Sequence, residues 1–92
     1  MNERFDSIWD AIESDPVEAE NMKIRASLLR AVINAIRSNG WSQAEAAERL
    51  GVTQPRVSDL MRGKIGKFSI DALANMAYLV GLRVGVTIAE AA

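Results

Sequence analysis

The sequence predicts an all-α domain of about five helices that ends in a short β-strand. Apolar residues recur at helical spacing in successive segments, and most of these segments lie between a capping residue and a glycine. The tail instead alternates between apolar and other residues, which is a strand pattern, with one face formed by Leu82, Val84, Val86 and Ile88. A chain of 92 residues is long enough for one domain with a small core.

The first half of the chain is expected to hold two helices. Residues 4–13 have apolar residues at helical spacing and an otherwise acidic surface, which predicts a short amphipathic helix. Asp15 and Pro16 resemble the cap and first turn of a second, longer helix that starts there or slightly later. Asn39 and Gly40 are a typical C-terminal stop for that helix.

Three shorter helices are expected after Gly40. Ser42 and Glu45 form a capping box for a helix that ends at Gly51, and Thr53 is placed to cap the next one, which runs through Met61. A glycine-containing loop follows. Ser69 then caps the last helix, with Phe68 placed to pack onto Leu73 and Gly81 at its end.

We therefore expect a single domain over residues 1–92. It divides into an acidic helical segment at 1–17, a helical core at 18–81 and a strand with a short tail at 82–92. The two short helices of the core, at 43–62, are joined by a tight turn.

Charge and composition restrict the function. The chain has no cysteine and no histidine, and no nucleophile stands beside a base in a known spacing, so neither an enzyme nor a metal or cofactor site is expected. No apolar run is long enough to span a membrane, which favours a cytoplasmic protein. Residues 1–21 have a net charge of 1 − 7 = −6, whereas residues 22–67 have 9 − 3 = +6. The basic middle suits a nucleic-acid partner despite the overall charge of −1.

The segment QAEAAERLGVTQPRVSDLMR at 43–62 resembles the helix-turn-helix of the Xre family, to which the Cro and C1 repressors belong. The resemblance implies a lambda-repressor-like DNA-binding domain. It assigns Ala47 as the small residue between the two helices and Gly51 as the turn residue with positive φ. The apolar residues that lock the two helices together are Leu50, Val52, Val57 and Leu60.

The same resemblance implies which residues meet double-stranded DNA. The second short helix presents Gln54, Pro55, Arg56, Ser58 and Asp59 to the major groove. Gln54 can pair with adenine and Arg56 with guanine, so these two are expected to read sequence. The residues expected at phosphates are Gln43, Thr53, Arg62, Lys64 and Lys67.

Two of these residues have alternative interpretations. Asp59 is expected to pair along the helix with Arg56 or Arg62 more than to read a base, although it could accept a hydrogen bond from cytosine. Pro55 falls in the first turn after Thr53, where its missing N–H costs the helix no hydrogen bond. Trp41 is expected to pack against the core.

Over residues 17–88 the chain also resembles the HigA-like antitoxins of type II toxin–antitoxin modules, through QPRVSDLxxGK followed by FSxDxL. That resemblance implies a dimeric autorepressor whose partner is a small basic RNase toxin of the RelE superfamily. A stand-alone Xre-type regulator shares the pattern, and a helical protein-interaction module without DNA binding is a further alternative.

The two ends of the chain leave alternatives open. The strand at 82–88 needs a partner for its backbone, either its symmetry mate in a homodimer on a palindromic operator or the sheet edge of a toxin. The acidic residues at 3–20 face away from DNA and either bind a basic toxin surface or only cover the core.

Overall fold

The computed structural model describes residues 15–91, and within that range it is all-α, as the sequence predicts. The helix expected at 4–13 lies outside the described residues. No β-strand occurs within 15–91. The elements in chain order are α2 (Pro16–Asn39), α3 (Gln43–Leu50), α4 (Gln54–Met61), the short 3-10 helix η1 (Ile65–Lys67) and α5 (Ile70–Leu79).

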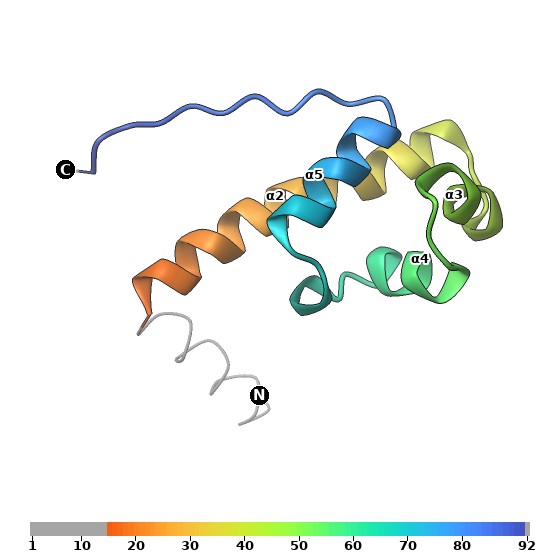
Figure 1. The fold of residues 1–92 in the computed structure, drawn as a ribbon, viewed down its shortest axis with the longest axis horizontal. Coiled ribbons are helices and arrows are strands. Elements are labelled where there is room, and N and C mark those ends of the chain that lie inside the picture. The colour runs from red at the N-terminus through yellow and green to blue at the C-terminus, as the bar shows by residue number, and fades with distance from the viewer. Residues whose placement is uncertain (1–14, 92) are drawn as a thin grey trace.

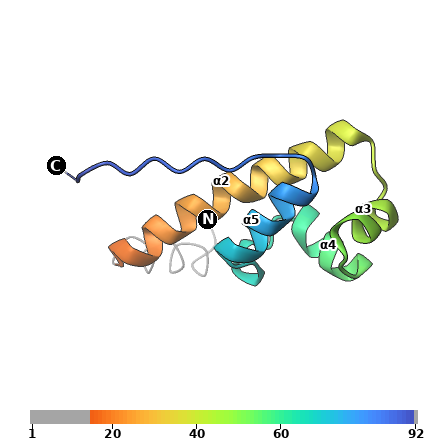
Figure 2. The ribbon, with the colours of Figure 1, turned by 45° about the horizontal axis from the view of Figure 1, so that its top comes forward.

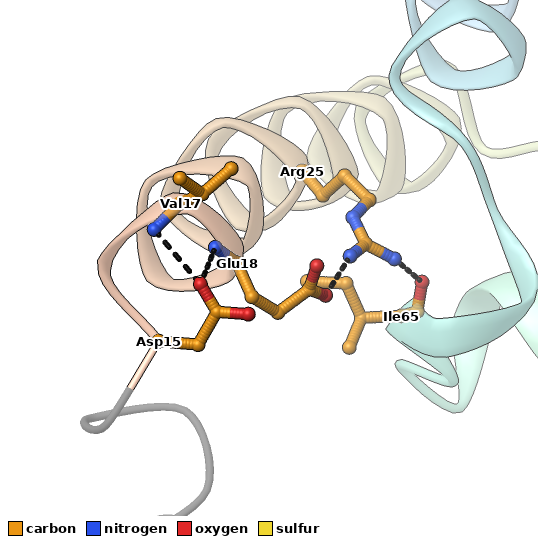
Figure 3. Close-up of polar contacts among 5 residues, drawn as sticks. All are labelled: Asp15, Val17, Glu18, Arg25 and Ile65. Atoms are coloured by element: carbon orange, nitrogen blue, oxygen red, sulfur yellow. Dashed lines mark hydrogen bonds and ion pairs between the residues drawn. The ribbon is translucent and has the colours of Figure 1, made fainter.

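Helix α2 begins where the sequence predicts it. The Asp15 side chain caps it by accepting hydrogen bonds from the backbone N–H groups of Val17 and Glu18 (Figure 3), and Pro16 occupies the first turn. The helix ends at Gly40, which has a φ of 66°. Both ends are therefore set by local sequence signals, and the helix between them extends over 24 residues.

The helices pack around the C-terminal half of α2. Helix α5 lies along α2, while α3 and α4 pack against each other at one end of the pair (Figures 1 and 2). Phe68, just before α5, is buried among the helices, as is Leu73. The complete buried core is Leu29, Val32, Ile36, Ala46, Ala47, Leu50, Val57, Leu60, Phe68, Leu73, Met76, Ala77 and Val80.

The turn between α3 and α4 has the geometry that the resemblance implies. Gly51 has a φ of 67°, a conformation that strains residues with a Cβ atom. Its N–H donates to the carbonyl of Glu48, and the N–H of Val52 donates to the carbonyl of Ala47 at 3.0 Å. This double hydrogen bond ends α3 and directs the chain into α4.

The strand expected at 82–88 is not formed. Helix α5 ends as the N–H of Leu82 donates to the carbonyl of Ala77, and the chain beyond it is extended but has no regular secondary structure (Figure 1). A β-strand is defined by hydrogen bonds to a neighbouring strand, and no other segment of residues 15–91 pairs with this one. The side chains of Val86 and Ile88 are consequently 79% and 87% exposed.

Replacing Gly51 with alanine should destabilise the domain through backbone strain alone. An added Cβ at this position has no heavy atom of a neighbouring residue within 4 Å, so sterics in the fold contribute nothing. Left-handed backbone costs a residue with a Cβ about 1–2 kcal/mol, which corresponds to a melting temperature lower by roughly 4–16 °C. Thermal unfolding followed by circular dichroism measures the change.

Gly66→Ala is the matched control for that experiment. Gly66 also has open space around it but does not have a positive φ, so its replacement should leave the melting temperature nearly unchanged. Equal melting temperatures for the two variants would contradict the role assigned to Gly51.

Candidate nucleic-acid interface

The exposed N-terminal end of α4 is built by a side-chain cap and a proline. The hydroxyl oxygen of Thr53 accepts a hydrogen bond from the backbone N–H of Arg56 at 3.3 Å. Pro55 lies in the first turn, where backbone N–H groups have no partner within the helix, so the proline removes no hydrogen bond. Gln54 and Pro55 are exposed. The predicted placement of Thr53 and Pro55 is confirmed, and the helix presents a stiff, polar tip.

Helix α3 begins with Ser42 as its predicted cap, although the reciprocal bond of a capping box, from the Ser42 backbone N–H to the Glu45 carboxylate, is not formed. The side chain of Ser42 accepts from the backbone N–H of Glu45 at 3.1 Å and lies 3.4 Å from the Glu45 carboxylate. Gln43 is the first residue of the helix and is exposed. Each helix of the motif therefore begins with an accessible glutamine side chain.

The two faces of α4 differ sharply. Val57 and Leu60 are buried and pack the helix onto the rest of the domain, and the half-buried Val52 also packs against the core. Four other residues are spaced at positions i, i+3, i+4 and i+7 of one helix turn pattern. This spacing places them together on the side of the helix away from Val57 and Leu60. They are Pro55, Ser58, Asp59 and Arg62, of which Pro55 and Arg62 are exposed and the other two half-buried.

Arg56 is turned toward the loop after α4. Its guanidinium group lies over the ring of Phe68, 4.0 Å from the ring centroid. The same group donates a hydrogen bond from Nη1 to the carbonyl oxygen of Lys67 at 2.7 Å. Both the face and one edge of the guanidinium are thus occupied by the protein itself. The sequence identified Phe68 only as a helix staple, because no rule of local spacing relates it to Arg56.

The expected pairing of Asp59 with Arg56 or Arg62 is wrong. The Asp59 carboxylate instead pairs with the side-chain ammonium groups of Lys64 and Lys67, each at 3.3 Å. Gly63 follows α4 with a φ of 72°, and the N–H of Lys64 donates to the carbonyl of Asp59. That turn brings the loop back beside α4, where both lysines reach the carboxylate.

The pKa of Asp59 reflects these contacts. Loss of hydration raises the pKa, but hydrogen bonds and charge attraction from Lys67 and Lys64 outweigh it, so the net shift is below the ordinary value of 3.8. Asp59 therefore neutralises part of the positive charge that the loop presents near α4.

The same loop also contacts α2 through Arg25. Arg25 of α2 pairs with Glu18 at 2.7 Å and donates a longer hydrogen bond, 3.5 Å, to the carbonyl of Ile65 in η1 (Figure 3). The Arg25 side chain is only 12% exposed. Glu18 and Arg25 are seven residues apart on one helix, a spacing that could have revealed the pair in the sequence, but Ile65 could not have been found that way.

Trp41 and Arg49 support α3. Trp41 is half-buried and packs against the core as predicted, and the guanidinium group of Arg49 lies over its ring, 5.1 Å from the centroid.

Within residues 15–91 no cluster of acidic side chains could hold a metal ion, and no described helix is long and apolar enough to cross a membrane.

The ion pairs of Asp59 should make stability depend on pH. A carboxylate whose pKa is lowered by folding stabilises the protein above its unfolded pKa, and this contribution is lost as the pH falls through the folded pKa. Asp59→Asn should therefore melt below the wild-type chain at about pH 7, with the gap closing as the pH falls below about 4. Thermal melts across this pH range measure the gap.

Glu90→Gln, which changes a carboxylate in the exposed C-terminal segment, serves as the control and should leave the melting temperature unchanged at each pH. A gap between wild type and Asp59→Asn that stays constant with pH would show that the ion pairs do not stabilise the fold.

Comparisons with known proteins agree with this geometry. A family model described as a helix-turn-helix domain matches residues 13–89. A solved structure of a protein assigned to the XRE family of transcriptional regulators is 32% identical and superposes with a TM-score of 0.74, covering 80% of this chain and 83% of that one. No curated protein matches the chain significantly. The chain therefore belongs to this family of helix-turn-helix domains and is an XRE-type transcriptional regulator.

Proposed function

We propose that the protein recognises a specific DNA sequence by placing the exposed end of α4 in the major groove. The observation that carries this proposal is the two-faced character of α4, whose apolar side is buried while its capped tip exposes Gln54 and Pro55. An α-helix fits the major groove of B-DNA, and the base edges there distinguish all four base pairs. A tip held by the core can carry such side chains without cost to the fold.

Each residue of the candidate interface has a role that its chemistry suits. Gln54 pairs with adenine, Pro55 contacts a thymine methyl group, and Ser58 and Asp59 lie further along the same face. Thr53 and Gln43 are exposed near the starts of their helices and contact phosphates. Arg62 and Lys64 extend the phosphate contacts beyond the end of α4, and Lys67 in the same loop adds to them.

A mobility-shift assay at several salt concentrations tests DNA binding. Gln54→Ala should lose about 1–3 kcal/mol of discrimination at one base pair while keeping the salt dependence. Arg62→Ala should weaken binding to all sequences alike and reduce the slope of log K against log salt by about 0.9, because one phosphate contact is lost. The DNA used is a duplex that the wild-type chain selects from a random pool.

Glu20→Gln is the control for that assay, since Glu20 is exposed on α2, outside α3, α4, the loop after α4 and the segment proposed for dimerisation, and its replacement should not affect affinity. Binding that has the same strength for every duplex, in wild type and variants, would argue for a protein-interaction module in place of a sequence reader.

The regulator is further proposed to act as a homodimer through α5 and the C-terminal segment. Two reading helices about 34 Å apart match successive major grooves on one side of a palindromic operator. The support is an apolar surface that a single chain leaves exposed, comprising Tyr78, Leu79, Val84, Val86 and Ile88. Residues 83–91 also offer backbone groups that a symmetry-related copy could pair as a strand.

Removing residues 84–92 should abolish that dimer and leave a folded monomer. The truncation keeps Leu82, whose N–H closes α5 and whose side chain packs against the core. Analytical ultracentrifugation should show the wild-type chain as a dimer and the truncated chain as a monomer that binds the selected duplex more weakly. Val86→Asp should act in the same direction, because it places a charge on the exposed apolar face. A truncated chain that still sediments as a dimer would exclude this interface.

An antitoxin role is the finer proposal. It rests on the resemblance at residues 54–73, and it implies that the chain represses its own gene and neutralises a basic RNase toxin of the RelE superfamily. An adjacent gene for a small basic protein that co-purifies with this chain would support the role. A stand-alone regulator remains the second candidate, and it has no such neighbour.

A further inference from the structure

Arg56 differs from its neighbours at the tip of α4. Gln54 and Pro55 are exposed, whereas Arg56 is half-buried even though it is charged. The Phe68 ring under its guanidinium group is 1% exposed and belongs to the core. Arg56 is therefore attached to the interior of the domain at the point where the DNA-facing tip begins.

The contacts of Arg56 form part of a closed circuit between α4 and the loop at 64–68. Arg56 binds the carbonyl of Lys67, the ammonium group of Lys67 binds Asp59, and Asp59 returns to α4 one turn after Arg56. Lys64 reinforces the circuit through the other oxygen of Asp59. Helix α4 is thus tied to the loop at two positions.

The loop also contacts the long helix α2 through one hydrogen bond. Arg25 of α2 is held by Glu18 and donates to the carbonyl of Ile65 in η1 (Figure 3). Because α2 is the longest described helix and packs along α5, this contact connects α4 through the loop to the most extended part of the core. The orientation of α4 therefore depends on both ends of this chain of contacts.

Base recognition at the tip of α4 would require Arg56 to give up these contacts. The Phe68 ring covers one face of the guanidinium group and Nη1 is bonded to the Lys67 carbonyl, so the group is held beside the loop, where its remaining N–H donors can bind only a partner that comes to that place. Gln54 has no such competing contact among the described residues and is free to pair.

We infer that Arg56 is a positioning residue, which sets the orientation of α4 through Phe68 and Lys67, and that base discrimination falls to Gln54 and its exposed neighbours. The inference rests on the proposed function, in which α4 enters the major groove. It replaces the expectation from sequence that Arg56 reads guanine.

The test compares base preference with affinity for Arg56→Gln. The wild-type chain first selects a preferred duplex from a random pool, and each variant is then measured on that duplex and on its single-base-pair substitutions. Arg56→Gln should bind every duplex about tenfold more weakly, with the order of preference unchanged, because a misplaced tip weakens all base contacts together. Its salt slope should equal that of wild type, because no phosphate contact is lost.

Three further variants separate positioning from other roles. Gln54→Ala should flatten the preference at one base pair, in contrast to Arg56→Gln. Arg56→Lys should recover part of the affinity, because an ammonium group can also lie over Phe68 and donate to the Lys67 carbonyl. Phe68→Leu removes the ring under the guanidinium, so Arg56→Gln should weaken binding less in that background than in wild type.

Several results would overturn the inference. Loss of preference at a single G·C pair would make Arg56 a base reader, and a salt slope reduced by about 0.9 would make it a phosphate contact. Wild-type affinity of the folded fraction of Arg56→Gln, with folding measured by circular dichroism, would leave Arg56 with a role in stability alone.

If Arg56→Gln does not fold, Arg56→Lys and Phe68→Leu provide the same comparison. Failure of the wild-type chain to enrich any duplex would contradict the proposed function itself, and this inference with it.

Discussion

Burial of the apolar side of α4 is the constraint on which the other features depend. A helix of eight residues is too short to be stable in water by itself, so α4 exists because Val57 and Leu60 are packed against the core and because Thr53 satisfies one of its first N–H groups. Once those contacts hold the helix, its opposite face is not needed for packing, although Asp59 on that face still pairs with the two lysines of the loop. That face can then be occupied by residues chosen for recognition.

Packing alone does not determine the orientation of a short helix. In this protein, polar contacts from Arg56 and Asp59 to the loop that follows α4 set the orientation of the helix. Arg25 of α2 donates a hydrogen bond to the same loop. The lysines of the loop have two uses in this arrangement. Their carbonyl and ammonium groups hold α4, while their charge lies next to the proposed DNA surface. Asp59 is therefore compatible with DNA binding. Its negative charge is paired with two lysines, which it holds beside the proposed DNA surface.

Signals close together in the sequence predicted most of the fold. The caps at Asp15, Ser42, Thr53 and Ser69 and the turn at Gly51 depend only on neighbouring residues, and each was placed correctly. The partners of Arg56 and Asp59 were not found, because they lie beyond Gly63, whose left-handed turn brings the loop back beside α4. A rule based on helical spacing can propose only partners within the helix.

The C-terminal segment illustrates a different limit. Alternation at 82–88 correctly indicates an extended chain with one apolar face, but a strand also needs a second chain segment to pair with, and residues 15–91 supply none. The sequence pattern therefore predicts the extended backbone and the apolar face of the segment, but not the chain that pairs with it.

The most direct measurement of the central claim is a map of amide chemical-shift changes when the selected duplex is titrated into the isotopically labelled chain. If α4 enters the major groove, the largest changes will fall on Gln43, on the amides of residues 53–59 other than Pro55 and on the loop at 62–67, while α5 and the C-terminal segment change little. Changes concentrated on α5 and residues 82–91, with α4 unaffected, would contradict the account, because they would place the binding surface on the opposite element of the fold.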